Sequence, residues 1–320
     1  MSTANQVPET WELTGDDARE TLRRVGVRQL AIDAWQRLRF ADGFSHARSL
    51  AYTTSLLLVQ AIIGMVGLAS ALGRGGFTDI VVRTLQAAVP GPAGHTLTRA
   101  VSQARTAGHA GQYIGLTFGL VGSLVTGATM MGQVERAMNR LYGVEADRPT
   151  LPKYRLAALL AASAGVLAAL ACWCLTMGRD LQRSWRNHAL EQVWAVARWP
   201  LGLLLMGAAI ALLFRWSPRR HQPAWSWLAY GSSISVLLWC AVTVSLGLFF
   251  SASKSFGDTY GPLAGVVALL LWSLLSSIAL LFGAALGAQL ESVRAGESEP
   301  QDQEKVADSE PELESAGQPG

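Results

Sequence analysis

The chain has 320 residues, of which 50% are hydrophobic and only 15% are charged. Soluble domains average about 25% charged residues, so this composition excludes an ordinary soluble two-domain protein. The net charge of +3 and the mean hydropathy of +0.27 average over a polar beginning, an apolar middle and an acidic end. We therefore expect an all-α, polytopic membrane helix bundle. No residue pattern specifies a reaction.

Residues 1–48 are predicted to form a cytoplasmic N-terminal segment that contains one amphipathic helix. Its apolar face comprises Val27, Leu30, Ala31, Ala34, Trp35 and Leu38. Arg28, Arg37 and Arg39 are expected on other faces, where anionic head groups attract arginines. The helix either lies along the lipid surface or packs on the protein's own cytoplasmic loops, and the sequence leaves both open.

Six apolar runs within residues 49–290 are long enough to cross a bilayer, because a spanning helix needs about 20 apolar residues. They are residues 49–72, 113–133, 156–177, 193–214, 225–250 and 260–290. The fourth run contains Arg198 and Pro200, but Arg198 is near its start, and we expect the guanidinium to snorkel to the membrane surface.

The distribution of Lys and Arg predicts the orientation. With the N-terminus inside, the cytoplasmic segments hold 17 of these residues and the outer segments hold eight. Positive residues concentrate on the cytoplasmic side, so both ends of the chain are expected there. We therefore predict a multi-pass protein of the cytoplasmic membrane, with membrane lipids as its first partners.

The outer segment between spans one and two, residues 73–112, has a helical pattern of its own. Apolar residues recur at helical spacing at Phe77, Ile80, Val81 and Leu85, and again at Leu97 and Val101. The sequence Pro90-Gly91-Pro92 separates the two sets. We expect two short amphipathic helices that cover the outer mouth of the bundle.

The spans also carry small and polar residues. Glycines recur four apart at Gly115/Gly119, Gly257/Gly261, Gly261/Gly265 and Gly283/Gly287. Such pairs let helices approach closely, either within the chain or between two copies of it. Serines on spans five and six either line a polar path or bond their own helices. Gln60 lies near the middle of span one and needs a partner or a water-filled cavity, since a buried unpaired amide costs about 2 kcal/mol or more.

Several kinds of chemistry lack candidates. No span has an acidic residue near its centre, there is no phosphate-binding glycine loop followed by Lys-Ser or Lys-Thr, and the five histidines are scattered. The three cysteines fall inside apolar runs and are interpreted as packing residues. We expect no catalytic residue, cofactor or metal site.

Residues 291–320 hold nine acidic residues against Arg294 and Lys305. The segment has almost no bulky apolar residue, so it cannot bury enough surface to offset the entropy of ordering its backbone. We predict a disordered acidic cytoplasmic tail.

Three groups of residues, from about residue 40 to residue 291, resemble the YihY/virulence factor BrkB family of bacterial inner-membrane proteins. The first is Leu50-Ala51-Tyr52 with Ser55-Leu56, and the second is Asn139-Arg140-Leu141-Tyr142 with Arg148. The third is Tyr260-Gly261-Pro262-Leu263-Ala264-Gly265, followed by Trp272 and Gly283-Ala284. Asp258 or Thr259 would cap this last helix, and Pro262 suits its first turn. Where the family has a proline, a Glu and an Asn, this chain has Leu58, Ala285 and Gly287, so any ion-coupling role of that Glu is not transferred.

The resemblance implies a protein of envelope integrity. We expect passive or partner-driven passage of lipid or a small solute, or alternatively a non-transporting scaffold that binds envelope proteins or a second copy of itself. Some relatives carry a ribonuclease label; we reject it, and with it a nucleic-acid partner, because the arginines flank membrane spans. The candidate functional residues are Tyr52, Gln60, Asn139, Arg140, Tyr142, Asp258, Tyr260, Gly261 and Trp272.

Overall fold

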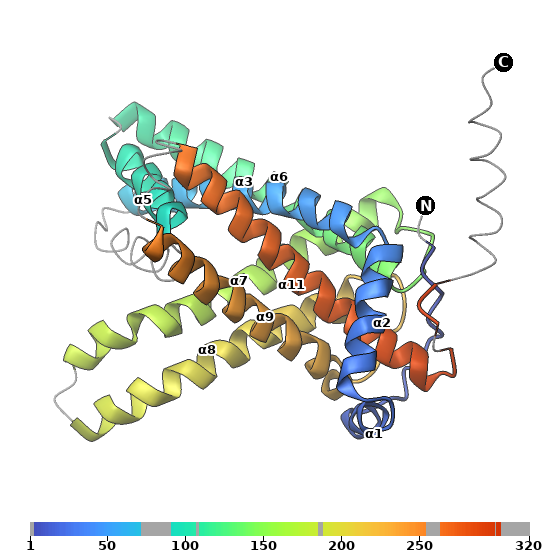
Figure 1. Cartoon of the computed structure of the whole chain (residues 1–320). Coiled ribbons are helices and arrows are strands. Elements are labelled where there is room, and N and C mark those ends of the chain that lie inside the picture. The colour runs from blue at the N-terminus through green and yellow to red at the C-terminus, as the bar shows by residue number, and fades with distance from the viewer. Residues whose placement is uncertain are drawn as a thin grey trace, which may run out of the picture.

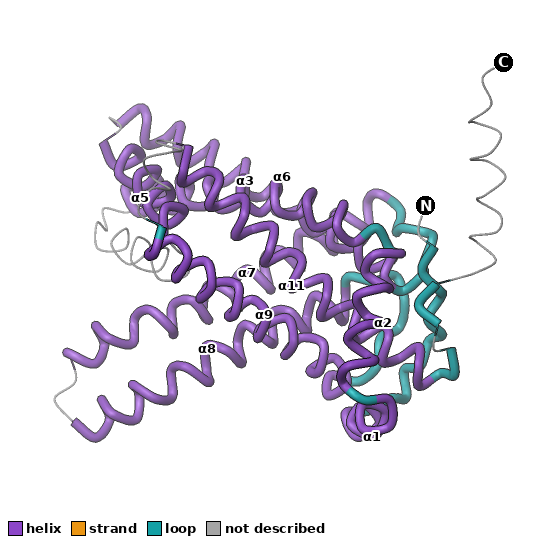
Figure 2. Tube along the Cα trace, viewed as in Figure 1, coloured by secondary structure: helices purple, strands orange, loops and turns teal. Residues whose placement is uncertain are grey.

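A computed structural model of the chain describes residues 3–71, 91–106, 109–184, 188–253, 263–297 and 299–301. Within these residues the chain is helical, and the one β-type pairing is an isolated bridge between Ala4 and Gln301. The predicted all-α class is confirmed (Figures 1 and 2).

The described residues form nine helices. They are α1 Gly15–Val25, α2 Val27–Phe40, α3 Gly43–Ala71, α5 Gly91–Thr106, α6 His109–Leu141, α7 Thr150–Ser184, α8 His188–Trp216, α9 Trp225–Ala252 and α11 Ala264–Arg294.

Each of the six predicted spans falls on one long helix: α3, α6, α7, α8, α9 or α11. Four of these helices contain stretches that are long and apolar enough to cross a membrane: Thr150–Cys174, Gln192–Trp216, Trp225–Ala252 and Ala264–Arg294. α3 and α6 have 29 and 33 residues, and at 1.5 Å per residue both exceed the thickness of the hydrocarbon layer. A helical membrane bundle is therefore established, and the total of six spans stays a prediction.

The long helices pack mainly in pairs. α3 lies against α6, α7 against α8, and α9 against α11, while α11 also contacts α3 and α2. α1, α2 and most of the loops gather at one end of the bundle, called here the α2 end (Figures 1 and 2). α5 lies at the opposite end, the α5 end, where it packs on α11 and α3 (Figure 1).

The two ends have separate apolar cores. The α2-end core takes residues from α2 and from all six long helices, among them Leu38, Met138, Leu160, Leu213 and Leu281. The α5-end core takes its residues from α3, α5, α9 and α11, among them Ile62, Leu97, Phe250 and Trp272. Within the described residues, α7 and α8 therefore join the common core only at the α2 end.

α2 packs on the protein, on α11, through Leu30, Ala34 and Leu38. This favours the second of the two interpretations of this helix. The predicted faces are partly wrong, because Val27 and Trp35 are exposed while Arg37 is completely buried. Arg37 lies seven residues after Leu30, which is nearly two helical turns, so the two residues share a face.

A helix is present where the second of the two outer helices is expected: it is α5, with Leu97 and Val101 buried. Its location on the outer side of the membrane stays a prediction. The first expected helix, around residues 77–85, lies outside the described residues. The predicted start of the last span also lies outside them, and α11 begins at Ala264.

α11 continues four residues past the predicted domain boundary at residue 290 and ends at Arg294. Residues 299–301 then lie beside the beginning of the chain, where the Asn5 N–H donates to the Pro300 carbonyl at 3.1 Å. The part of the predicted tail from residue 302 onward is outside the described residues.

Small residues set the closest helix contacts, as the glycine pattern predicts. A methyl group added at Gly283 would overlap Ser235 and the Gly231 carbonyl oxygen of α9, and one added at Gly119 would overlap the backbone of α3 at Gly64. At Gly119 and Gly283 the close approach is therefore between helices of one chain, and contact between two copies of the chain stays a prediction.

We predict that Gly283→Ala lowers the free energy of unfolding by about 1–3 kcal/mol, because the methyl group has no room between α11 and α9. The control is Gly165→Ala on α7, where nothing lies within 4 Å of an added methyl group. Alanine should be neutral or stabilising there, since it forms helices better than glycine does. Thermal unfolding in detergent measures both; equal behaviour of the two variants would contradict the close packing of α9 and α11.

Candidate functional site

Buried polar side chains gather at the α2 end, and Arg37 of α2 makes the largest number of contacts among them. Its Nε donates to Gln289 Oε1 at 2.7 Å, and one terminal nitrogen donates to Ser292 Oγ at 3.1 Å. The other donates to the carbonyl oxygens of Asn5 at 2.9 Å and Leu141 at 3.1 Å. Burial lowers the pKa of the Arg37 guanidinium to about 10, so the group is still charged at pH 7. One side chain thus joins α2 to α11, to the end of α6 and to the start of the chain.

A buried ion pair lies beside Arg37. Arg220, from the loop between α8 and α9, donates to Glu291 Oε1 of α11 at 2.5 Å, and the two side chains are 2% and 0% exposed. Thr10 donates to the same carboxylate oxygen through its hydroxyl at 2.6 Å and through its N–H at 3.3 Å. The Arg220 guanidinium also lies over the ring of Tyr142, 4.6 Å from its centroid. Glu291, predicted as the first residue of a disordered tail, is instead a fully buried anion.

Asn139 holds two loops at the end of α6. Its Nδ2 donates to Asp147 Oδ1 at 3.0 Å, and its Oδ1 accepts the Arg219 N–H at 2.8 Å. Arg148 spans the same two loops, donating to the carbonyl oxygens of Ser217 at 2.6 Å and Pro218 at 2.8 Å. The predicted group of Asn139, Tyr142 and Arg148 is therefore brought together, as the link between the α6–α7 and α8–α9 loops.

Asp147 is the acidic centre of this link. Burial alone would raise the pKa of its carboxyl group, but the hydrogen bonds from Asn139 and Lys153 and the charges of Lys153 and Arg136 hold that pKa below its usual value. Lys153 Nζ lies 3.0 Å from Asp147 Oδ2. The carboxylate is thus stabilised in its ionised form.

We call the connected polar residues at this end the α2-end network. It consists of Thr10, Arg37, Asn139, Tyr142, Arg220, Gln289, Glu291 and Ser292, and all of their side chains except that of the half-buried Thr10 are buried.

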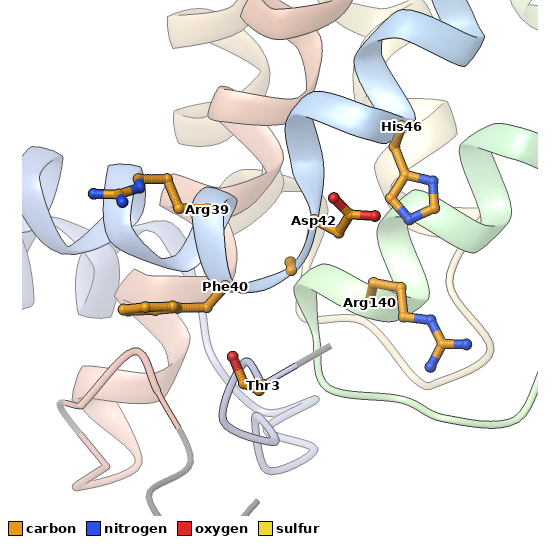
Figure 3. A pocket seen from close by; sticks show the side chains of 7 residues that line it. Thr3, Arg39, Phe40, Asp42, His46 and Arg140 are labelled. Carbon is orange, nitrogen blue, oxygen red and sulfur yellow. The ribbon is translucent and has the colours of Figure 1, made fainter. Parts of the chain in front are cut away.

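A cavity of about 550 Å³ lies next to the network, between the α2–α3 corner, the end of α6 and the beginning of the chain (Figure 3). It is lined by Thr3, Arg39, Phe40, Ala41, Asp42, His46 and Arg140. Asp42 turns the chain from α2 into α3 with a φ of 54°, a conformation that Asp and Asn tolerate better than most residues. Of the predicted site residues, Arg140 is the one that reaches this cavity.

Some polar residues inside the membrane region are paired across helices, and others bond their own helix. The Thr126 hydroxyl of α6 donates to Gln60 Oε1 of α3 at 2.7 Å, which supplies the partner that Gln60 needs. Trp272 Nε1 of α11 donates to Thr243 Oγ1 of α9 at 3.2 Å. Ser277 donates to the Ser273 carbonyl oxygen of its own helix at 2.7 Å. Gln60 and Trp272 thus join pairs of helices and lie apart from the cavity.

Arg198 does not extend as predicted. It is only 9% exposed, and its guanidinium carbon lies 5.5 Å from the centroid of the Trp199 ring. Snorkelling requires a side chain that reaches water, so that expectation is not supported by this geometry.

α6 and α7 diverge from the α2 end toward the α5 end. At Gly127 of α6, an added methyl group would lie 3.7 Å from Ala161 of α7. One turn further along α7, nothing lies within 4 Å of a methyl group at Gly165, and one turn back along α6 the side chain of Leu124 is 71% exposed. We give the name α6/α7 opening to the place where the two helices separate, next to Leu120 and Leu124 of α6 and Gly165 and Ala168 of α7. These four residues are apolar.

The remaining predicted site residues are not brought together. Tyr52 is 61% exposed on α3, away from the network. Asp258, Tyr260 and Gly261 lie outside the described residues.

Arg37, Arg220, Gln289 and Glu291 were missed as site residues. A signal existed for Arg37, because helical spacing places it on the apolar face with Leu30 and Ala34. Glu291 follows an apolar run directly, as boundary residues of many membrane helices do, whereas Arg220 lies six residues after the run that ends at residue 214. Their pairing depends on two loops that meet only in the folded chain.

Comparison with known proteins gives a consistent answer. The sequence profile of the family described as Virulence factor BrkB matches residues 34–308. YfkH of Bacillus subtilis, named a ribonuclease-like protein, is 24% identical over 81% of this chain and 94% of its own length. UPF0761 membrane proteins of Rhodospirillum centenum and Xanthomonas campestris are 28% and 26% identical over 89% and 81% of this chain. The chain covers less than two thirds of those two proteins, 63% and 60% of their lengths. No solved structure matches significantly.

We predict that Glu291→Gln lowers the free energy of unfolding by about 3–5 kcal/mol, because it leaves Arg220 charged and buried without an anion. The double variant Arg220→Met with Glu291→Gln should be less destabilised than the sum of its single variants, which a double-mutant cycle in detergent measures.

The control for this cycle is Arg24→Gln, which breaks the exposed pair of Arg24 and Glu20 at 3.1 Å. Exposed pairs contribute about 0–1 kcal/mol, so its unfolding should change little. Additive effects at residues 220 and 291 would contradict a buried ion pair.

Proposed function

The chain belongs to the virulence factor BrkB family, and on that premise we propose that it is a cytoplasmic-membrane protein that lets lipid, or a small solute, pass through the bilayer without an energy source of its own. The names of the UPF0761 relatives support the membrane location. The α2 end is proposed to face the cytoplasm, because the excess of Lys and Arg lies in the segments on that side.

The observation that carries the proposal is the attachment of α7 and α8 at one end alone. These helices contribute to the α2-end core, and the described α5-end core is built from α3, α5, α9 and α11. Figure 1 shows the two helices leaving the other elements as they run away from α2. An apolar space between helices that diverge inside the membrane suits acyl chains better than ions, which need polar ligands.

A passive mechanism agrees with the intramembrane residues. Gln60, Thr126 and Trp272 are engaged in helix–helix hydrogen bonds, and the centres of the spans contain no acidic residue in the sequence. Proton or cation coupling usually relies on such carboxylates. The proposed function includes no enzymatic reaction and no nucleic-acid partner. The ribonuclease-like name of YfkH is not applied to this chain.

A second candidate is a non-transporting scaffold. The hydrogen bond between Gln60 and Thr126 favours it, because side chains that satisfy each other do not need a water-filled path. Crosslinking in cells would then recover a reproducible envelope protein or a second copy of the chain. If crosslinkers placed at many positions capture no partner and yield the protein alone, the scaffold function is contradicted.

We predict that the purified full chain, reconstituted into vesicles, exposes a fluorescent inner-leaflet phospholipid to a quencher outside much faster than protein-free vesicles do. The variant Gly165→Cys, made with Cys172, Cys174 and Cys240 replaced by Ala, places a thiol in the α6/α7 opening. Labelling it with a bulky maleimide should slow the exposure toward the rate of protein-free vesicles.

The matched control is Ser163→Cys in the same background, since Ser163 is exposed on the opposite face of α7. Its labelling should leave the rate unchanged. Equal inhibition at both positions, or no acceleration by the unlabelled protein with a broad panel of lipids and solutes, would count against the proposal.

A further inference from the structure

The cavity at the α2–α3 corner has the chemistry of an anion site. Two arginines line it from different elements, Arg39 from the last turn of α2 and Arg140 from the last turn of α6. The Thr3 hydroxyl lies on the side toward the beginning of the chain, and Arg39 and Arg140 lie on opposite sides of it in the view of Figure 3, with their guanidinium groups directed away from each other. Guanidinium groups and hydroxyls together are the donors that phosphate oxygens accept from most strongly.

The charge of the cavity comes from its arginines. His46 lies beside Asp42 in the lining, and burial lowers the pKa of its imidazole, which is therefore mostly neutral at pH 7. Asp42 contributes one negative charge. Two arginines and one carboxylate leave a net positive charge, which suits a phosphate diester or monoester.

The cavity lies at the edge of the membrane region. Asp42 and His46 precede the apolar run that begins at Ser49, within about two helical turns. Ile32 and Trp35 of the neighbouring helix α2 are exposed beside the same corner, 42% and 44% respectively. An exposed tryptophan next to arginines at the end of a spanning helix is typical of the head-group layer.

We propose that this cavity binds a phosphate group, which Arg39 and Arg140 hold together with Thr3 after both arginine side chains turn toward it, and that the phosphate belongs either to the head group of an anionic phospholipid or to free phosphate. The site is independent of the proposed passage of lipid, because it lies at the α2 end, whereas the α6/α7 opening widens toward the α5 end.

The experiment titrates the detergent-solubilised full chain with three probes: dihexanoyl phosphatidylglycerol, inorganic phosphate and dihexanoyl glycerol. We expect saturable binding of phosphatidylglycerol, and none of dihexanoyl glycerol, which lacks the phosphate. If inorganic phosphate binds more weakly than dihexanoyl phosphatidylglycerol, the ligand is a lipid head group. If inorganic phosphate binds with equal or higher affinity, the ligand is free phosphate.

The double variant Arg39→Gln with Arg140→Gln should weaken binding by about tenfold or more, because it removes two charge-assisted contacts. The control Arg28→Gln removes the same charge from the exposed beginning of α2, roughly 16 Å from Arg39 along the helix, and should leave the affinity unchanged.

Asp42→Asn tests the site without relying on a loss. Asparagine tolerates the left-handed backbone at this position, and removal of the carboxylate should tighten phosphate binding about two- to fivefold. A misfolded variant does not gain affinity. The proposal is overturned by the absence of saturable binding of both phosphate probes, by equal binding of dihexanoyl glycerol, by an equal loss in Arg28→Gln, or by an unchanged affinity in Asp42→Asn.

Discussion

The burial of three charged side chains, Arg37, Arg220 and Glu291, determines where several helices and loops of this structure must meet. A charge taken out of water costs several kcal/mol unless hydrogen bonds and an opposite charge replace the lost hydration. Arg37 meets that condition with four acceptors from three parts of the chain, and Arg220 meets part of it with Glu291, the Pro8 carbonyl oxygen and the face of Tyr142. Because those partners come from α2, α6, α11 and the α8–α9 loop, all of these elements must end in one place. Among the described residues, Arg220 Nε and Nη1 and Glu291 Oε2 have no hydrogen-bond partner.

The same condition explains why the two ends of the bundle differ. Helices in lipid gain no hydrophobic free energy by associating, so they are held by close contacts and hydrogen bonds. At the α2 end every long helix also contributes apolar residues to one common core. Toward the α5 end, α9 and α11 are joined by the hydrogen bond of Trp272 to Thr243, while α7 and α8 pack against each other. A hairpin fixed at one end only is an arrangement that leaves apolar surface open to lipid, on which the proposed function rests.

The family-like residues Asn139, Tyr142 and Arg148 serve this architecture directly. They bind loop carbonyls, a loop carboxylate and the stacked Arg220, so their contacts are those of residues that hold loops in place. Arg140, in the same group, instead lines the neighbouring cavity (Figure 3). One short sequence thus contributes both to the α2-end network and to the proposed phosphate site.

The sequence by itself determined the helical membrane class, the positions of six long helices and the helix at 91–106, because each depends on the length, hydropathy and period of one continuous run. It also indicated close helix contacts at glycines such as Gly119 and Gly283. Only the tertiary structure decided that Arg37 is buried, that Glu291 is an ion-pair partner in an ordered helix, and that α7 leaves α6 beyond Gly127. The physical reason is that local periodicity states which face of a helix is apolar, whereas the burial of a charge depends on partners such as Gln289, which is 252 residues away from Arg37 in the chain.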